Sequence, residues 1–340
     1  MADPDPGRAS GPVVVEAVPF SSFMADALYG PHGFYTRGGS AGRRGDFLTS
    51  PEVGPLFGAV IARHLDEVWT RLERPAPFTV VEVGAGPGTL ARSILAASPR
   101  CLASLRYIAV EVSAGQRARH PEGIESVSTM PHDPIEGVVL ANELLDNLPF
   151  RLAVHDGGWR EAFVVRLPDG RLVEQLSAPF DPLPPMLPAN APHGARAPLH
   201  DEASAWVAAA RRSVRRGSVI AFDYCVARTA ELVGRPWREW LRTYRSHERG
   251  AHYLAAVGEQ DIPTEVAVDQ LPEPDVVRSQ SQWLQLHGID ELVDEGRRVW
   301  AERASRPDLE AIRMRSRVSE AEALLDPSGL GGFSVLEWHS

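Results

Sequence analysis

The stretch Val81-Glu82-Val83-Gly84-Ala85-Gly86-Pro87-Gly88-Thr89 decides the fold of this chain. It continues an apolar, β-rich run that begins at Phe78, and it leads into a helical pattern from Thr89. Glycine permits a tight turn between strand and helix and lets a ligand approach the main chain. Nucleotide-like cofactors bind at such loops in doubly wound sheets. The stretch therefore predicts an α/β fold with a cofactor against the loop at 84–88.

The spacing of the glycines narrows the class of cofactor. A dinucleotide fingerprint would place its third glycine at position 89, where this chain has threonine. The observed GxGxG pattern, with Glu82 inside the preceding strand, is typical of methyltransferases, whose loop contacts the methionine part of S-adenosylmethionine (SAM). A plain glycine turn between strand and helix is the alternative explanation.

A second acidic residue follows at the end of the next expected strand, residues 105–111. Glu111 stands there, followed by Val112 and Ser113. A carboxylate at this position can accept hydrogen bonds from both hydroxyls of a ribose. Alternatively, Glu111 only precedes a helix and interacts with its dipole. The glycine loop and this acid together favour an adenosine-bearing ligand, but they do not separate SAM from NAD.

The fourth expected strand, residues 137–141, leads into candidate catalytic residues. Asn142, Glu143 and Asp146 follow it directly. The two acids are three positions apart, so on a helical turn they would share one face. Two carboxylates there could hold a cationic or amine acceptor and orient its lone pair toward a methyl group. A helix start, with Asn142 as its cap and acids in its first turn, explains the same residues equally well.

The chain organises around alternating apolar strands and helical segments, a pattern typical of a parallel sheet covered on both faces. A helix is expected to open at 49–52 and to continue to Trp69. We expect the following units: a disordered tail at 1–12, an N-terminal helical cap at 13–75, a Rossmann-like core at 76–224 with an antiparallel insertion at 150–177, a mainly helical substrate-side region at 225–330, and a terminal core strand at 331–340.

Composition excludes several other functions. The 35 basic residues are all arginine and face 45 acidic ones, and a net charge of −10 argues against a nucleic-acid binder. The absence of lysine removes Schiff-base and P-loop chemistry. Scattered histidines and two distant cysteines suggest no metal and a reducing cytoplasm. No apolar run approaches the ~20 residues that a membrane-spanning helix needs, and 1–12 does not resemble a signal peptide.

Several segments together resemble the MidA-like SAM-dependent methyltransferases, whose mitochondrial members assist respiratory complex I assembly and methylate an arginine on a complex I subunit. Beside the glycine loop, the segments that carry the resemblance are Tyr29-Gly30-Pro31-His32-Gly33-Phe34-Tyr35, Gly45-Asp46-Phe47-Leu48-Thr49-Ser50-Pro51-Glu52, Asn142-Glu143-Leu144-Leu145-Asp146-Asn147-Leu148-Pro149, residues 279–289 and residues 331–336. The resemblance covers nearly the whole chain.

The resemblance implies a class I methyltransferase fold with an N-terminal helical cap and substrate-side insertions. It places Gly84, Gly86, Gly88 and Glu111 at SAM. It also implies that Asn142, Glu143 and Asp146 face the acceptor, and that a segment containing Asp46, Thr49 and Ser50 closes over the cofactor or acceptor. Glu82, Ala85 and Val112 complete the expected cofactor site.

The substrate side departs from the family pattern at 225 and at 261–268. The resemblance itself implies methyl transfer to a protein arginine, on a respiratory complex I subunit or another protein. A weakly active or inactive assembly factor and a small-molecule methyltransferase remain alternatives. The glycine spacing disfavours an NAD oxidoreductase. A homodimer is possible, because the antiparallel insertion could offer a free sheet edge.

Overall fold

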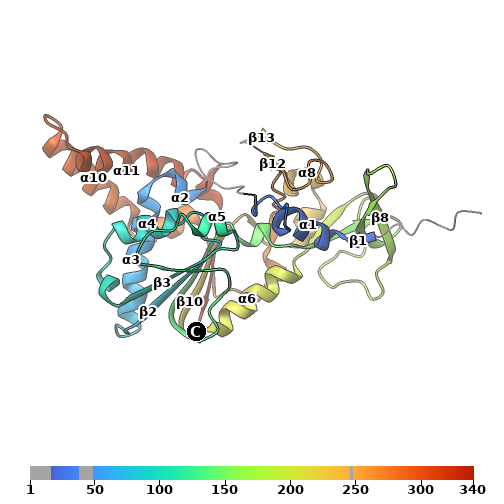
Figure 1. Ribbon diagram of the computed structural model, residues 1–340, viewed down its shortest axis with the longest axis horizontal. Helices are drawn as coiled ribbons and strands as arrows, with labels where there is room; N and C mark the ends of the chain where they lie inside the picture. Colours follow the sequence, from blue (N-terminus) through green and yellow to red (C-terminus); the bar gives the residue numbers. More distant parts are fainter. Residues whose placement is uncertain (1–16, 38–48, 246–247) are drawn as a thin grey trace, which may run out of the picture.

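The computed structural model describes residues 17–37, 49–245 and 248–340. The expected tail at 1–12 and Asp46 lie outside these residues. Figure 1 shows an elongated molecule with a central sheet, a second sheet at one end and a pair of long helices, α10 and α11, at the other.

The central sheet confirms the expected α/β, Rossmann-like class. Its strand order is β15-β16-β10-β5-β2-β3-β4. The strands β10, β5, β2, β3 and β4 pair in parallel, whereas β16 pairs antiparallel with β10 and β15. Their bounds are β2 Phe78–Val83, β3 Leu105–Val110, β4 Glu125–Val127, β5 Ile135–Asn142, β10 Val214–Asp223, β15 Val276–Ser279 and β16 Ser334–His339.

Strand β15 is an element that was not expected within the mainly helical region at 225–330. Its four residues pair with the terminal strand β16 and extend the sheet by one strand. A strand this short offers too few alternations to be recognised by pattern. From 225 to 275 the chain forms only short elements: β11 Cys225–Val226, α7 Thr229–Val233, α8 Trp237–Trp240, β12 Tyr244–Arg245, β13 Glu248–Arg249, β14 Val266–Ala267 and a 3₁₀ turn at Val268–Gln270.

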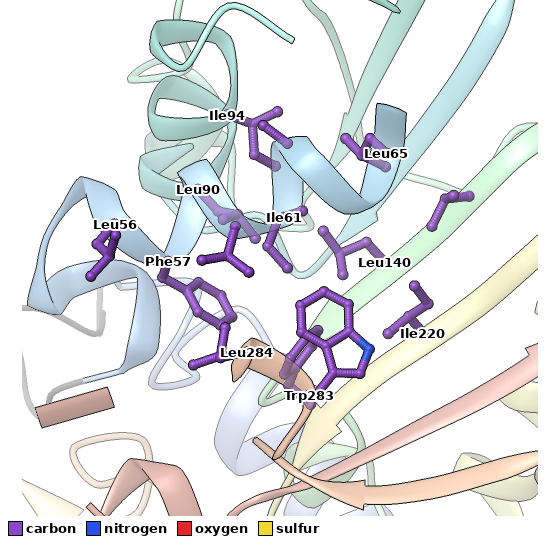
Figure 2. Close-up of a cluster of buried hydrophobic side chains, with 14 of the residues drawn as sticks. Leu56, Phe57, Ile61, Leu65, Leu90, Ile94, Leu140, Ile220, Trp283 and Leu284 are labelled. Carbon is purple, nitrogen blue, oxygen red and sulfur yellow. The ribbon is translucent and has the colours of Figure 1, made fainter. Parts of the chain in front are cut away.

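Helices cover both faces of the central sheet because alternate strand residues are apolar on each side. On one face lie α3 (Pro55–Arg71), α4 (Thr89–Ala96) and α9 (Gln280–Leu286). Figure 2 shows Phe57 and Ile61 of α3 in one buried cluster with Trp283 of α9 and with Leu140 and Ile220 of the sheet. The other face packs against α6 (Asp201–Ser213). A 3₁₀ helix at Arg100–Ser104 directly precedes β3, and the short helix α5 (Ala114–Arg117) lies between β3 and β4.

The second sheet is antiparallel and larger than the insertion expected at 150–177. It contains β1 Ala17–Pro19, β6 Arg151–His155, β7 Trp159–Arg166, β8 Leu172–Pro179 and β9 Arg196–Leu199. Helix α1 (Phe20–Tyr29) packs on it, and the rings of Phe20 and Phe150 lie 5.2 Å apart. The expected cap at 13–75 is therefore divided. Helix α1 belongs to the second sheet, whereas α3 belongs to the core.

The helix expected to run from 49–52 to Trp69 is two helices, α2 (Ser50–Val53) and α3. Gly54 separates them, and a Cβ at this position would lie 2.2 Å from the carboxyl carbon of Glu320. That carboxylate accepts the backbone N–H of Leu56 at 2.8 Å and so satisfies the start of α3. The break depends on a residue 264 positions away, so a local pattern does not reveal it.

The C-terminal region forms a helical hairpin of α10 (Ile289–Arg303) and α11 (Leu309–Leu325), followed by a 3₁₀ turn at Leu330–Gly332. Figure 1 shows the hairpin projecting beyond the sheet. Among the helices that the structure describes, none combines the length and apolarity needed to cross a bilayer.

Candidate functional site

A cavity of about 500 Å³ lies where the parallel strands β2, β3 and β5 end. This is the edge at which doubly wound sheets bind their ligands, and the volume suits a small-molecule cofactor. The residues expected at the site that line the cavity are Thr49, Glu82, Gly84, Ala85, Gly86, Glu111, Val112, Asn142 and Glu143. Ser50, Gly88 and Asp146 are not among its lining residues.

The glycine loop has the left-handed backbone that its sequence suggested. Gly84, Gly86 and Gly88 all have positive φ, at 71°, 51° and 78°. A Cβ built at Gly86 would meet no described atom within 4 Å, so this position opens onto the cavity. At Gly88, by contrast, a Cβ would lie 2.9 Å from Pro121, so this position is enclosed by protein rather than open to the cavity.

Glu111 holds the glycine loop in place. Its carboxylate accepts backbone N–H groups from Gly86 at 2.9 Å and from Ser113 at 2.8 Å. Burial raises the pKa of Glu111, and these two hydrogen bonds oppose the shift. The neighbouring Val112 is 58% exposed and lines the cavity, so it offers an apolar surface to a planar ring.

Glu82 lies deeper, within β2. The hydroxyl of Tyr107 donates to its carboxylate at 2.7 Å, and burial raises its pKa to about 7. Because the side chain also lines the cavity, it can accept a hydrogen bond from a ligand amine.

The opposite end of the cavity is acidic. Glu143 has a positive φ of 50°, and its backbone N–H donates to Phe222 in the next strand. Its carboxylate receives hydrogen bonds from the side chain of Asn142, at 3.2 Å, and from the backbone of Ser50. Burial, followed by the negative charge of Asp223, raises the pKa of Glu143 to about 8.

The expected pairing of Glu143 and Asp146 on one helical face does not occur. Only Leu145–Asn147 form a 3₁₀ turn, and Glu143 precedes it in a left-handed conformation. Asp146 is 2% exposed, and the side chain of Asn147 donates to it at 3.2 Å. Of the two acids, Glu143 lines the cavity and Asp146 does not.

Two further acids, Asp223 and Asp261, lie close enough to raise the pKa of Asp146 by their charge, after burial itself. Asp223 ends β10 and is fully buried, whereas Asp261 belongs to the loops beyond the fifth parallel strand. With Glu143 and Asp146 they make an acidic group from three distant parts of the chain. Such a group favours a cationic ligand.

Two amide oxygens at this end have no hydrogen-bond partner among the described residues. They are Oδ1 of Asn142 and of Asn147, both buried, on residues that line the cavity. In each residue the nitrogen faces a carboxylate, of Glu143 or of Asp146, which fixes the orientation of the amide. A buried acceptor without a partner is costly, so these oxygens are suited to N–H groups of a ligand.

Sequence reasoning missed several lining residues. Tyr29 and Tyr35 stack with ring centroids 5.5 Å apart, and the Tyr29 hydroxyl donates to the backbone oxygen of Asn147 at 2.9 Å. Both tyrosine pKa values are raised, chiefly by burial. Their segment carries the family resemblance, but its sequence alone does not indicate that both rings line a cavity. Met130 and Trp206 also line the cavity, from a loop and from α6, and no local pattern marked them.

The cavity therefore has one end suited to an adenosine-bearing cofactor and one suited to a cation. The residues present fit SAM on two observations: an open backbone at Gly86 and a carboxylate fixed at Glu111. A methyl donor and a cationic acceptor could meet between these ends.

Known protein structures support this interpretation. A Burkholderia thailandensis protein solved with S-adenosyl-homocysteine aligns with a TM-score of 0.81 and 26% identity, covering 95% of this chain and 88% of that protein. A native structure of an uncharacterized protein from the same bacterium gives a TM-score of 0.78 at 26% identity, covering 95% of this chain and 87% of the other.

Sequence relatives agree. The Drosophila melanogaster homologue of the mitochondrial protein arginine methyltransferase NDUFAF7 is 31% identical over 179 residues, which are 43% of this chain and 41% of that protein. Human NDUFAF7 is 28% identical over 192 residues, covering 46% and 42%. The chain thus spans less than half the length of these curated relatives.

A family model described as "Putative S-adenosyl-L-methionine-dependent methyltransferase" matches residues 60–287, which is more than half of the chain and includes the glycine loop, Glu111 and Glu143. The chain therefore belongs to this family of SAM-dependent methyltransferases.

Proposed function

We propose that this protein methylates an arginine side chain of a protein substrate. The observation that carries the proposal is the acidic end of the cavity, where the carboxylate of Glu143 lies beside the unpartnered oxygens of Asn142 and Asn147. A guanidinium is a planar cation with five N–H donors, and it suits a site that offers a carboxylate and further acceptors. The names of the sequence relatives support the same substrate.

The chemistry asks two things of the protein. When bound, SAM would supply a methyl group to a guanidinium nitrogen of the acceptor, which the protein must orient and from which a proton must be removed. Asn142 and Asn147 can orient the guanidinium through its N–H groups. Glu143 can accept the proton that the nitrogen loses as the new carbon–nitrogen bond forms.

The raised pKa of Glu143 suits a proton acceptor near neutral pH. In the cavity as described, burial and the charge of Asp223 hold the proton on Glu143. A guanidinium placed beside it would lower that pKa again, because an opposite charge favours the carboxylate. Binding of the acceptor would thus convert Glu143 to the carboxylate that can accept a proton from it.

A test of the substrate class uses purified protein, isotopically labelled SAM and an extract of arginine-containing proteins. We expect label in proteins and, after complete hydrolysis, in methylated arginine. Label in lysine or histidine would overturn the arginine proposal but keep protein methylation. Label in small metabolites alone would favour a small-molecule methyltransferase, and binding of S-adenosyl-homocysteine without any transfer would favour an assembly factor.

The compartment and partners also remain proposals. Cys101 and Cys225 are free thiols, which suits a reducing compartment such as the cytoplasm. The proposed partner is a protein substrate rather than a nucleic acid, given the net charge of −10. A homodimer through the second sheet is testable by sedimentation.

A further inference from the structure

A second group of chemically competent side chains lies away from the cavity, on the face of the central sheet that α3 and α9 cover. His64 and Glu67 belong to α3, and His287 directly follows the last residue of α9. Their ligand atoms all lie within 4.8 Å of one another. None of the three lines the cofactor cavity.

His64 is the residue that the fold alone does not explain. It is 4% exposed, and both of its ring nitrogens are buried without a hydrogen-bond partner among the described residues. Its ring packs against Trp283 and His287, with centroids 5.0 and 4.5 Å away. Burying an imidazole with neither nitrogen satisfied costs free energy. A ligand for one nitrogen would remove that cost.

The other two side chains supply the rest of a site. Glu67 Oε2 lies 2.8 Å from His287 Nδ1 and 3.8 Å from His64 Nδ1. His64 and Glu67 are three residues apart on one helix, which puts them on the same face. Glu67 is half exposed, and the His287 side chain is 10% exposed, so an ion and a water molecule can reach the group from solvent.

These distances match the needs of a tetrahedral ion. Zinc binds imidazole nitrogen and carboxylate oxygen at about 2.1 Å, which puts neighbouring ligand atoms about 3.4 Å apart. The two separations that involve Glu67, 2.8 and 3.8 Å, lie on either side of this value, and all the ligand atoms lie within 4.8 Å of one another. Two histidines and one glutamate, with a fourth position open to water, form a known zinc ligand set.

We propose that His64, Glu67 and His287 bind a divalent transition-metal ion, with Zn²⁺ as the ion that this ligand set fits best. The ion would join α3 to the end of α9, directly before α10 begins at Ile289. Arg63 already donates to the backbone oxygen of Gly288 at 2.9 Å across the same junction. Metal binding there would stabilise the attachment of the α10–α11 hairpin to the core.

The sequence did not predict this site, and the scattered histidines suggested no metal. His287 is 220 residues from Glu67 and completes the ligand set only after folding. The site is independent of the proposed methyl transfer, so either proposal can fail alone.

The test uses the full chain without an affinity tag, first treated with a chelator and dialysed. Calorimetric titration with Zn²⁺ should show one ion per chain, and the ion should raise the melting temperature. Co²⁺ should give visible absorption bands of the intensity typical of four-coordinate sites. This spectrum needs no variant and therefore tests the site in the unaltered protein.

Variants then locate the ion. Glu67→Gln replaces the carboxylate ligand and His287→Gln replaces one imidazole ligand. Each substitution should weaken Zn²⁺ binding at least tenfold. His193→Gln is the matched control. His193 lies 3.4 Å from Asp156 as an exposed pair of the same ligand types, outside the proposed site. It should leave Zn²⁺ affinity unchanged.

Absence of Zn²⁺ binding to the unaltered chain, or one-to-one binding that survives both Glu67→Gln and His287→Gln, would overturn the proposal. Binding of several ions with equal weak affinity would also overturn it, because it would indicate scattered surface histidines. Binding of S-adenosyl-homocysteine by each variant shows that the fold is retained.

Discussion

The carboxylate of Asp223 accepts the backbone N–H of Leu145 at 2.8 Å, and this contact fixes the turn that follows Glu143. The same carboxylate accepts N–H groups from Leu144 and Tyr224. Asp223 is fully buried at the end of β10, 78 residues from the turn. The last residue of one core strand thus orders the loop after its neighbour, β5, and places Glu143 in the cavity.

We predict that Asp223→Ala lowers the free energy of unfolding by about 2 kcal/mol or more, because several buried N–H groups lose their acceptor. Urea unfolding measures the change. Ser218→Ala is the control on the same strand, since the buried Ser218 hydroxyl has no hydrogen-bond partner among the described residues and its removal should cost little. Equal effects of the two substitutions would contradict the role assigned to Asp223.

Glu143→Gln should lower the rate of methyl transfer at least 100-fold, the usual range for loss of a general base. It should change the affinity for S-adenosyl-homocysteine less than threefold, because Glu143 lies at the acceptor end. Glu320→Gln is the control, as a buried glutamate that caps α3 and does not line the cavity. An unchanged rate in Glu143→Gln would exclude the proposed proton acceptor.

Gly86→Val should weaken binding of S-adenosyl-homocysteine at least 100-fold, measured by calorimetry. The branched side chain would occupy the open space beside the loop, at a φ of 51° that only glycine adopts readily. Gly157→Val carries a similar backbone penalty, at a φ of 62° in a turn of the second sheet, and also faces open space. If both variants bind equally well, the cofactor lies elsewhere.

The rate should rise with pH. Glu143 must be a carboxylate to accept a proton, and its pKa of about 8 leaves it mostly protonated at pH 6. We expect kcat/KM to increase from pH 6 through pH 8 and to level off only above about pH 9, because this parameter reports groups of the free protein. A profile that is flat over this range would place the essential base on another residue.

Stability should change in the opposite direction. The pKa of Glu143 is about 8 in the folded protein, against an ordinary value of 4.5. The folded state therefore binds more protons than the unfolded state between these values, and stability falls as pH rises through that window. The melting temperature should decrease from pH 5 to pH 8, and Glu143→Gln should reduce this slope. An identical slope in the variant would assign the effect to other groups.

Much of the fold could be predicted because its signals are local. The glycines at 84–88, with an apolar run before them and a helical pattern after them, specify a strand, a turn and a helix through backbone conformations that only glycine adopts easily. Glu111 was found in the same way, from its place at the end of the next strand. The break at Gly54 and the strand β15 were missed, since both depend on residues far along the chain.

The residues of the candidate site also separate into those that local sequence signals predict and those that depend on distant parts of the chain. The sequence by itself determined the α/β class, the glycine loop, Glu111 and the acidic segment after β5, because spacing, alternation and turn chemistry act over a few residues. Only the tertiary structure decided that Glu143 lines the cavity while Asp146 does not, that Asp223 and Asp261 lie close to Asp146, and that two stacked tyrosines line the cavity. Side-chain direction depends on a left-handed backbone at Glu143 and on contacts between distant strands, which no short pattern records.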